Sequence, residues 1–382
     1  MKDFNFRIPQ NIIFGMGSLK KLPEIMKENH MHHVFLISDH GLERLGVVKK
    51  IQDIIEGAGF ACTSYLDLKS NPTQEIVSAA ASQYQKCGAS SIIALGGGSP
   101  MDVAKAVGVL AKYGGDISDY EGNSKVPGPI IPIIAIPTTA GTGSEVTASA
   151  IITNEQTNFK FAVFSYELFP QYAILDPELI MTAPAPIAAA CGLDALIHAM
   201  EAYISKNSTP FSDAFAEKAM KLIGANLRRF VASRQDQEAA CAMMAGSNFA
   251  GISFVWAKLG IVHAMSHPVS GFFHVAHGVA NSVLLPTVME YNALADHGRY
   301  EIIYNAIQQG TEPVKNFRPE MLVEELRALN KGLGIPASLR ELGVTEDKIP
   351  AMAADAMKSG NILTNPREAG LEDIIALYKK AF

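Results

Sequence analysis

The first half of the chain alternates short apolar runs with longer amphipathic stretches, and this alternation constrains the fold more than any other feature. Two stretches, Leu42–Ile55 and Gln74–Lys86, repeat apolar residues at helical spacing. The runs around them have the length and boundaries of strands: His33–Ser38, Ala61–Leu66, Ser91–Leu95 and Ile130–Ile136. Such alternation predicts a parallel sheet with helices on both faces.

The second half has a different character. After Ala183-Pro184-Ala185-Pro186 the chain is rich in Ala, Leu and Met and keeps a helical period to the C-terminus. We therefore predict a Rossmann-like α/β nucleotide domain over residues 1–182 and an all-helical domain over residues 183–382. A length of 382 residues provides core for two domains.

Composition and charge exclude several partners. A formal net charge of −6 gives no basic surface for nucleic acid or an anionic membrane. The most apolar stretch, Ala239–Met265, includes Lys258 and His263, which predicts a buried helix and no membrane span. No Cys-x-x-Cys spacing occurs and the start lacks a signal peptide, so we expect a cytoplasmic protein with four reduced thiols: Cys62, Cys87, Cys191 and Cys241.

Histidines are concentrated in one apolar segment, Gly260–Gly278, which holds four of the ten in the chain: His263, His267, His274 and His277. Burying so many imidazoles without partners is costly, so a bound cation or nearby carboxylates would compensate. Upstream, Asp194 and His198 are spaced i and i+4, which places both on one face of a predicted helix. An isolated buried histidine is usually a core residue, but this combination favours a metal site for Fe(II), Zn, Mn, Co or Ni.

Two loops have the composition of nucleotide-binding loops. The strand Ser91–Leu95 runs into three glycines followed by Ser99 and Pro100, where free N–H groups of a helix N-terminus could meet a pyrophosphate. Met101 stands where the Gly-x-Gly-x-x-Gly fingerprint needs its third glycine, so a tight turn without ligand explains the loop equally well. The second loop, Pro137–Thr147, offers hydroxyls for ribose and phosphate oxygens, or is a solvated surface loop.

The paired motifs Gly192-Leu-Asp-Ala-Leu-Ile-His-Ala-Met-Glu-Ala-Tyr203 and Gly260-Ile-Val-His-Ala-Met-Ser-His267 resemble signatures of the iron-containing (group III) alcohol dehydrogenases. The resemblance covers essentially the whole chain. It implies a dehydroquinate-synthase-like fold, homodimers or larger homo-oligomers, and a ferrous ion with these ligands: Asp194, His198, His263 and His277.

The same resemblance implies NAD as the second cofactor. Asp39, after the first predicted strand, would accept the ribose 2′-OH and so favour NAD over NADP, although it could simply cap a turn. Asn71 also suits a common Asn-Pro turn, and Lys160 could be an ordinary surface lysine. The implied NAD contacts are Asp39, Asn71, Gly97, Gly98, Ser99, Asp102, Thr138, Thr139, Thr142, Thr147 and Lys160.

The activity implied is hydride transfer between NAD and a small primary alcohol or diol, with the metal lowering the pKa of the substrate oxygen. His267, one turn after His263, is the candidate proton relay or a residue that orients a ligand; Pro268 should kink or end the helix there. Glu201 is expected to orient the site or form a structural pair. Trp256 is expected to line the substrate pocket, and His274 to line the pocket or simply to fill space.

Three other functions compete. A dehydroquinate-synthase-like lyase would need a pocket rich in Lys and Arg, but only Lys160 and Lys258 are basic near the proposed site. A glycerol-dehydrogenase-like enzyme would oxidise a polyol instead. A sensor that binds metal and nucleotide without turnover would keep the same residues.

Overall fold

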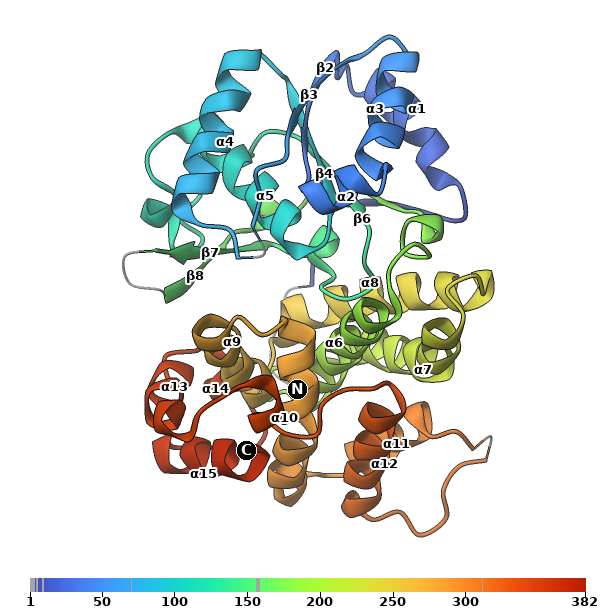
Figure 1. The fold of residues 1–382 in the computed structure, drawn as a ribbon, viewed down its shortest axis with the longest axis vertical. Helices are drawn as coiled ribbons and strands as arrows, with labels where there is room; N and C mark the ends of the chain where they lie inside the picture. Colours follow the sequence, from blue (N-terminus) through green and yellow to red (C-terminus); the bar gives the residue numbers. More distant parts are fainter. Residues whose placement is uncertain (1–3, 5, 9, 70, 156–158, 311) are drawn as a thin grey trace. The chain divides into compact units, whose positions relative to one another are not determined.

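The computed structural model describes residues 4, 6–8, 10–69, 71–155, 159–310 and 312–382. The chain forms two compact units (Figure 1). The α/β unit comprises Arg7–Thr139 and Gly143–Thr182. The helical unit comprises Ala183–Phe382, together with Ala140–Thr142 and the extreme N-terminus up to Phe6.

A six-stranded parallel sheet organises the α/β unit, with the spatial order β1-β9-β6-β4-β2-β3. Its strands are β1 (Asn11–Phe14), β2 (His33–Ile37), β3 (Ala61–Tyr65), β4 (Ser91–Gly96), β6 (Ile133–Pro137) and β9 (Tyr172–Leu175). The order reverses between β2 and β4, because the chain passes from β2 outward to β3 and then returns to the other side of β2. Ligands of open α/β sheets bind beyond the carboxyl ends of the strands at such a point.

Helices cover both faces of this sheet, as the alternating pattern predicts. Alternate residues of the central strands point to opposite faces. Val34, Leu36 and Ile93 pack with α1 (Leu22–Glu28) and α3 (Val47–Gly57), while Phe35 and Ile92 pack with α4 (Gln74–Cys87) and α5 (Gly98–Tyr113). Figure 1 shows the two helix pairs on either side of the strands.

The predicted helix Leu42–Ile55 is instead two helices. A short helix α2 (His40–Arg44) ends before Gly46, and α3 follows it. Gly46 has φ 75°, a left-handed conformation that interrupts the helix and that glycine adopts without strain. A smaller sheet, not predicted, has the order β5-β8-β7, formed by β5 (Gly122–Asn123), β7 (Ser149–Asn154) and β8 (Phe159–Phe164).

In the described part of residues 183–382 every regular element is helical. The α-helices are α6 (Ala185–Ile204), α7 (Pro210–Ala232), α8 (Gln237–Ala257), α9 (Ile261–Phe273), α10 (His277–Asn292), α11 (Arg299–Ile307), α12 (Pro319–Gly332), α13 (Ile349–Ala356), α14 (Asn361–Thr364) and α15 (Leu371–Ala381). Helices α6 and α8 are long and apolar enough to cross a membrane, but 89% and 67% of their apolar windows are buried, so they are core helices.

Candidate metal centre and nucleotide-binding loops

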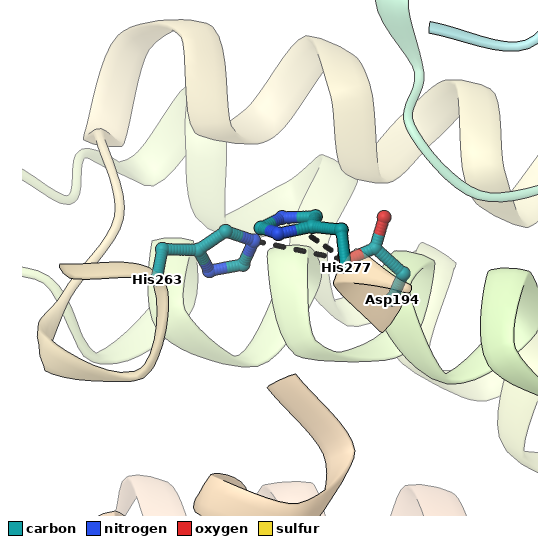
Figure 2. A group of neighbouring side chains, drawn as sticks. All are labelled: Asp194, His263 and His277. Carbon is teal, nitrogen blue, oxygen red and sulfur yellow. Dashed lines mark ion pairs between the residues drawn. The ribbon is translucent and has the colours of Figure 1, made fainter. Parts of the chain in front are cut away.

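Three helices of the helical unit bring a carboxylate and two imidazoles together. Asp194 lies on α6, His263 on α9, and His277 begins α10. The Oδ1 atom of Asp194 is 3.8 Å from Nε2 of His263 and 3.8 Å from Nε2 of His277. One donor atom from each residue lies within 4.8 Å of the other two, and Figure 2 shows both rings directed toward the carboxylate.

Gly278 permits this convergence. A Cβ atom at this position would lie 2.3 Å from the carbonyl oxygen of Ala190 on α6, a distance that no real side chain tolerates. The glycine therefore lets the first turn of α10 approach α6 closely enough for His277 to meet Asp194.

Glu201 fixes the orientation of the His263 ring. Its Oε2 atom is 2.5 Å from Nδ1 of His263, and its Oε1 atom accepts the backbone N–H of Val262 at 2.7 Å. An Nδ1–H that donates to this carboxylate leaves the Nε2 lone pair facing Asp194, which is the arrangement of a metal-ligating histidine with an orienting carboxylate. Burial raises the pKa of Glu201 to about 7, although backbone N–H groups oppose the shift.

His198 lies beside the three-residue group, outside the set of donor atoms within 4.8 Å of one another. Its ring stacks on that of His263, with centroids 4.6 Å apart, and on that of Phe254, with centroids 4.5 Å apart. Its Nδ1 atom is 3.3 Å from the carbonyl oxygen of Gly141. An N–H at Nδ1 would donate to this carbonyl and leave Nε2 as an acceptor.

The charges of Asp194, His263 and His277, which together form the cluster, suit metal ligation. Burial lowers the pKa of His263 and His277 well below the ordinary imidazole value, so both rings are neutral and keep a lone pair. Burial alone would raise the pKa of Asp194, but the neighbouring imidazoles and Asn281 outweigh it and lower that pKa. A charged carboxylate among neutral imidazoles is a donor set for a divalent transition metal.

Of the other residues predicted near the metal, one contacts the cluster and two have other surroundings. The His267 ring stacks on that of His277, with centroids 5.3 Å apart. The helix does not end at His267, because α9 continues through Pro268 to Phe273. His274 is exposed at the C-terminal cap of α9, and Trp256 packs 5.3 Å from the Phe6 ring.

Three of the predicted nucleotide-binding residues lie at the carboxyl edge of three neighbouring strands of the α/β unit. Asp39 follows β2, Gly97 follows β4, and Thr138 follows β6. Asp39 caps α2 by accepting the N–H of Leu42 at 3.0 Å. This edge includes the reversal of strand order between β2 and β4.

The glycine turn after β4 leads directly into α5. Gly96 has φ 145°, and a Cβ there would lie 2.6 Å from Cγ of Pro100, so only glycine fits. Helix α5 starts at Gly98, and Gly97 provides no side-chain cap. Gly98 and Ser99 therefore contribute first-turn N–H groups, which are suited to an anion.

Two residues predicted as NAD contacts form hydrogen bonds with other residues of the protein. Asp102 accepts hydrogen bonds from Ser144 Oγ at 3.1 Å and from the Ile151 N–H at 3.2 Å. Thr147 is buried, and its hydroxyl oxygen accepts from Lys105 Nζ at 2.8 Å. Burial raises the pKa of Asp102 to about 6, against the opposing charge of Lys105. These contacts fix the conformation of the loop Pro137–Thr147.

A further pair of predicted contacts comes together. Lys160, on β8, donates to Oδ1 of Asn71 at 2.9 Å. Burial lowers the pKa of Lys160, while the charge of Asp102 opposes the shift. The structure thus places both side chains in one polar patch of the α/β unit.

Comparison with known proteins decides the family. A model described as iron-containing alcohol dehydrogenase matches residues 9–177, and one described as the C-terminal part of the Fe-containing alcohol dehydrogenase family matches residues 188–382. The chain belongs to the iron-containing alcohol dehydrogenase family. The predicted family and fold class are confirmed.

Relatives match this alcohol dehydrogenase over nearly its full length. It is 37% identical to the 1,3-propanediol dehydrogenase of Citrobacter freundii, covering 99% of each chain, and 38% identical to the lactaldehyde reductase of Escherichia coli K12, covering 97% of each. It is 35% identical to the NAD-dependent methanol dehydrogenase of Bacillus methanolicus, covering 99% of each. A crystal structure of a 1,3-propanediol oxidoreductase superposes with a TM-score of 0.96 at 36% identity, covering 100% of both chains.

The sequence reasoning missed three residues of this alcohol dehydrogenase. Lys105, one turn after Asp102 in a predicted helix, is fully buried, and its position in an apolar segment was an available signal. Phe254 stacks on His198, and no pattern in the sequence indicated that contact. Asn281, one turn after His277, contacts three residues of the cluster.

Proposed function

We propose that this alcohol dehydrogenase uses NAD and a divalent metal, Fe(II) first among the candidates, to interconvert a small primary alcohol or diol and its aldehyde. The observation that carries the proposal is the convergence of Asp194, His263 and His277 in a chain of this family. Two neutral imidazoles and a carboxylate fit such an ion. The proposed fourth ligand is His198, whose ring lies against His263.

When bound, the ion would supply a Lewis acid that stabilises negative charge on the substrate oxygen. The chain's own residues prepare its place: Glu201 sets the His263 tautomer, and Asp194 stays ionised among neutral rings. For His267 we propose the part of a proton relay, on the basis of its ring contact with His277.

For NAD we propose the carboxyl edge of β2, β4 and β6, within a nucleotide domain of residues 1–182, with the metal domain at residues 183–382. Gly97, Gly98 and Ser99 would face the pyrophosphate, and Asp39 the ribose. The further proposed contacts are Asn71, Asp102, Thr138, Thr139, Thr142, Thr147 and Lys160. Asp102 and Thr147 also form hydrogen bonds within the protein that hold the loop.

We also propose a cytoplasmic homo-oligomer. Within the described residues the four cysteines form no disulfide. Within the described residues β1 pairs only with β9, and its Ile12 and Phe14 are exposed, which leaves an edge available to a second copy. Light scattering after size exclusion would measure the oligomeric state, and a monomer would contradict this part.

Turnover by metal-stripped protein reloaded anaerobically with Fe(II) tests the main proposal. NADH formation is expected with methanol, 1,3-propanediol or another short alcohol, and only after metal is restored. Turnover of glycerol alone would indicate a polyol enzyme. Binding of Fe(II) and NAD without turnover in either direction would contradict the proposal and favour a sensor. A pH profile of kcat for His267→Ala tests the relay, since loss of a relay changes the profile.

Replacing Asp39 with serine is expected to relax the preference for NAD. Serine can still cap α2, but it removes the negative charge that would repel a 2′-phosphate. The ratio of kcat/KM with NADP to that with NAD should rise about ten- to hundredfold, which corresponds to the removal of about 1.4–2.7 kcal/mol of like-charge repulsion. Asp53→Ser, on the exposed face of α3, is the control. An unchanged ratio in Asp39→Ser would remove Asp39 from the cofactor site.

A further inference from the structure

Asn281 occupies the middle of the proposed metal centre. It lies on α10 one turn after His277, and its side chain is fully buried. Its amide nitrogen is 2.7 Å from Oδ1 of Asp194, 3.1 Å from Nε2 of His263 and 3.1 Å from Nε2 of His277. These are the same three atoms that converge in the cluster.

The amide N–H groups compensate the lone pairs of these atoms. Three acceptors directed at one point in a buried site would repel one another unless a cation or a hydrogen-bond donor lies between them. The contacts have hydrogen-bond lengths, longer than the roughly 2.0–2.2 Å at which such atoms bind a metal. Asn281 thus contacts all three ligands through one side chain.

The other end of the same amide lacks a partner. Among the described residues, Oδ1 of Asn281 is a buried oxygen without a hydrogen bond. Such atoms are rare, because most buried polar groups are paired. A half-turn of the amide about its Cβ–Cγ bond exchanges the nitrogen and the oxygen. An N–H donor faces anions and lone pairs, whereas a carbonyl oxygen faces a cation.

We propose that Asn281 is a further residue of the metal centre: its amide contacts the three ligand atoms and turns to present Oδ1 to a bound ion. This inference rests on the proposed metal site. It adds an oxygen donor, Oδ1 of Asn281, to the implied ligands.

Co(II) binding, measured by competition with a chromophoric chelator, tests the inference without turnover. Asn281→Leu removes both amide ends, while Asn281→Asp keeps an oxygen and adds negative charge. Asn226→Leu, which replaces a buried asparagine on α7 whose amide donates to the Leu222 carbonyl, is the matched control. We expect Asn281→Leu to weaken Co(II) binding about 10- to 100-fold and to change its visible spectrum. Asn281→Asp should bind at least as tightly as wild type, and Asn226→Leu like wild type.

Each other outcome has a definite meaning. Wild-type protein that binds no Co(II) would overturn the proposed metal centre itself. Wild-type affinity and spectrum in Asn281→Leu would overturn the role of Asn281 alone. Equal weakening in the Asp and Leu variants would show that the N–H groups matter and the oxygen does not, which overturns the turn of the amide. If Asn281→Leu fails to fold, Asn281→Ala replaces it, and tenfold weaker binding by Asn281→Asp still overturns the proposal.

Discussion

Turnover by the His263→Ala variant is expected to fall by about 10³-fold or more, because a metal ion contributes several kcal/mol of transition-state stabilisation and each 1.4 kcal/mol is tenfold in rate. His263 has three polar partners: Glu201 at Nδ1, and Asp194 and Asn281 near Nε2. Its loss removes a ligand and also leaves the buried Glu201 carboxylate without its imidazole. The measurement is kcat/KM for NADH formation, together with metal content.

His297→Ala is the matched control. His297 is exposed in the segment after α10, outside the cluster. This variant should keep its metal and its activity. A His263→Ala protein that is folded, contains stoichiometric metal and turns over within a few-fold of wild type would show that the cluster is structural. A folded His263→Ala protein without metal and without turnover would show that turnover requires the metal that His263 helps to bind.

Much of the fold was predictable because its central strands are buried on both faces. Such strands form continuous apolar runs, and β2 and β4 follow the predicted ranges to within a residue. Strand β9, which lies between β1 and β6, was not predicted, since its four residues give no distinct pattern. The break between α2 and α3 depends on the conformation of one glycine, which apolar spacing does not indicate.

Spacing along one helix predicted only part of the site. Asp194 and His198 fall on one face of α6, but only Asp194 has a donor atom in the group formed with His263 and His277. Contacts between helices left no such trace, so Asn281 and the stacking of Phe254 on His198 emerge only from the packing. Trp256, the more conspicuous residue in the sequence, packs on Phe6 instead.

The nucleotide loops show a related limit. Hydroxyl and acidic residues beside a glycine turn suggest ligand contacts, yet such residues also satisfy a buried cation of the protein itself. Thr147 contacts Lys105, and Ser144 contacts both Lys105 and Asp102. A sequence pattern does not show whether a side chain contacts the cofactor or instead contacts protein groups that hold the cofactor-binding loop. The answer depends on the direction in which each side chain points.

Replacing Lys105 with methionine should therefore destabilise the α/β unit and its loop together. The Lys105 ammonium donates to four oxygens: the Ser144 carbonyl, Ser144 Oγ, Thr147 Oγ1 and the Ser149 carbonyl. Methionine fills the same space but leaves buried oxygens unpaired and Asp102 without its compensating charge. We expect a loss of about 3–5 kcal/mol in the free energy of unfolding, as for other buried charges that lose a partner. Urea unfolding and hydrogen exchange at the backbone N–H groups of residues 144–149 measure it.

Lys112→Met, an exposed position on the same helix, should leave both measurements unchanged. The pH dependence separates loss of charge from loss of packing. Burial lowers the pKa of Lys105 from 10.5 to about 8, so at this site the unfolded chain binds more protons between these values, and the contribution of Lys105 to wild-type stability rises with pH across that window. The methionine variant lacks this rise, so its deficit relative to wild type should widen from pH 8 to 10.5. A variant as stable as wild type at every pH would mean that the buried ammonium is dispensable, and that the loop carrying Thr147 is held by packing alone.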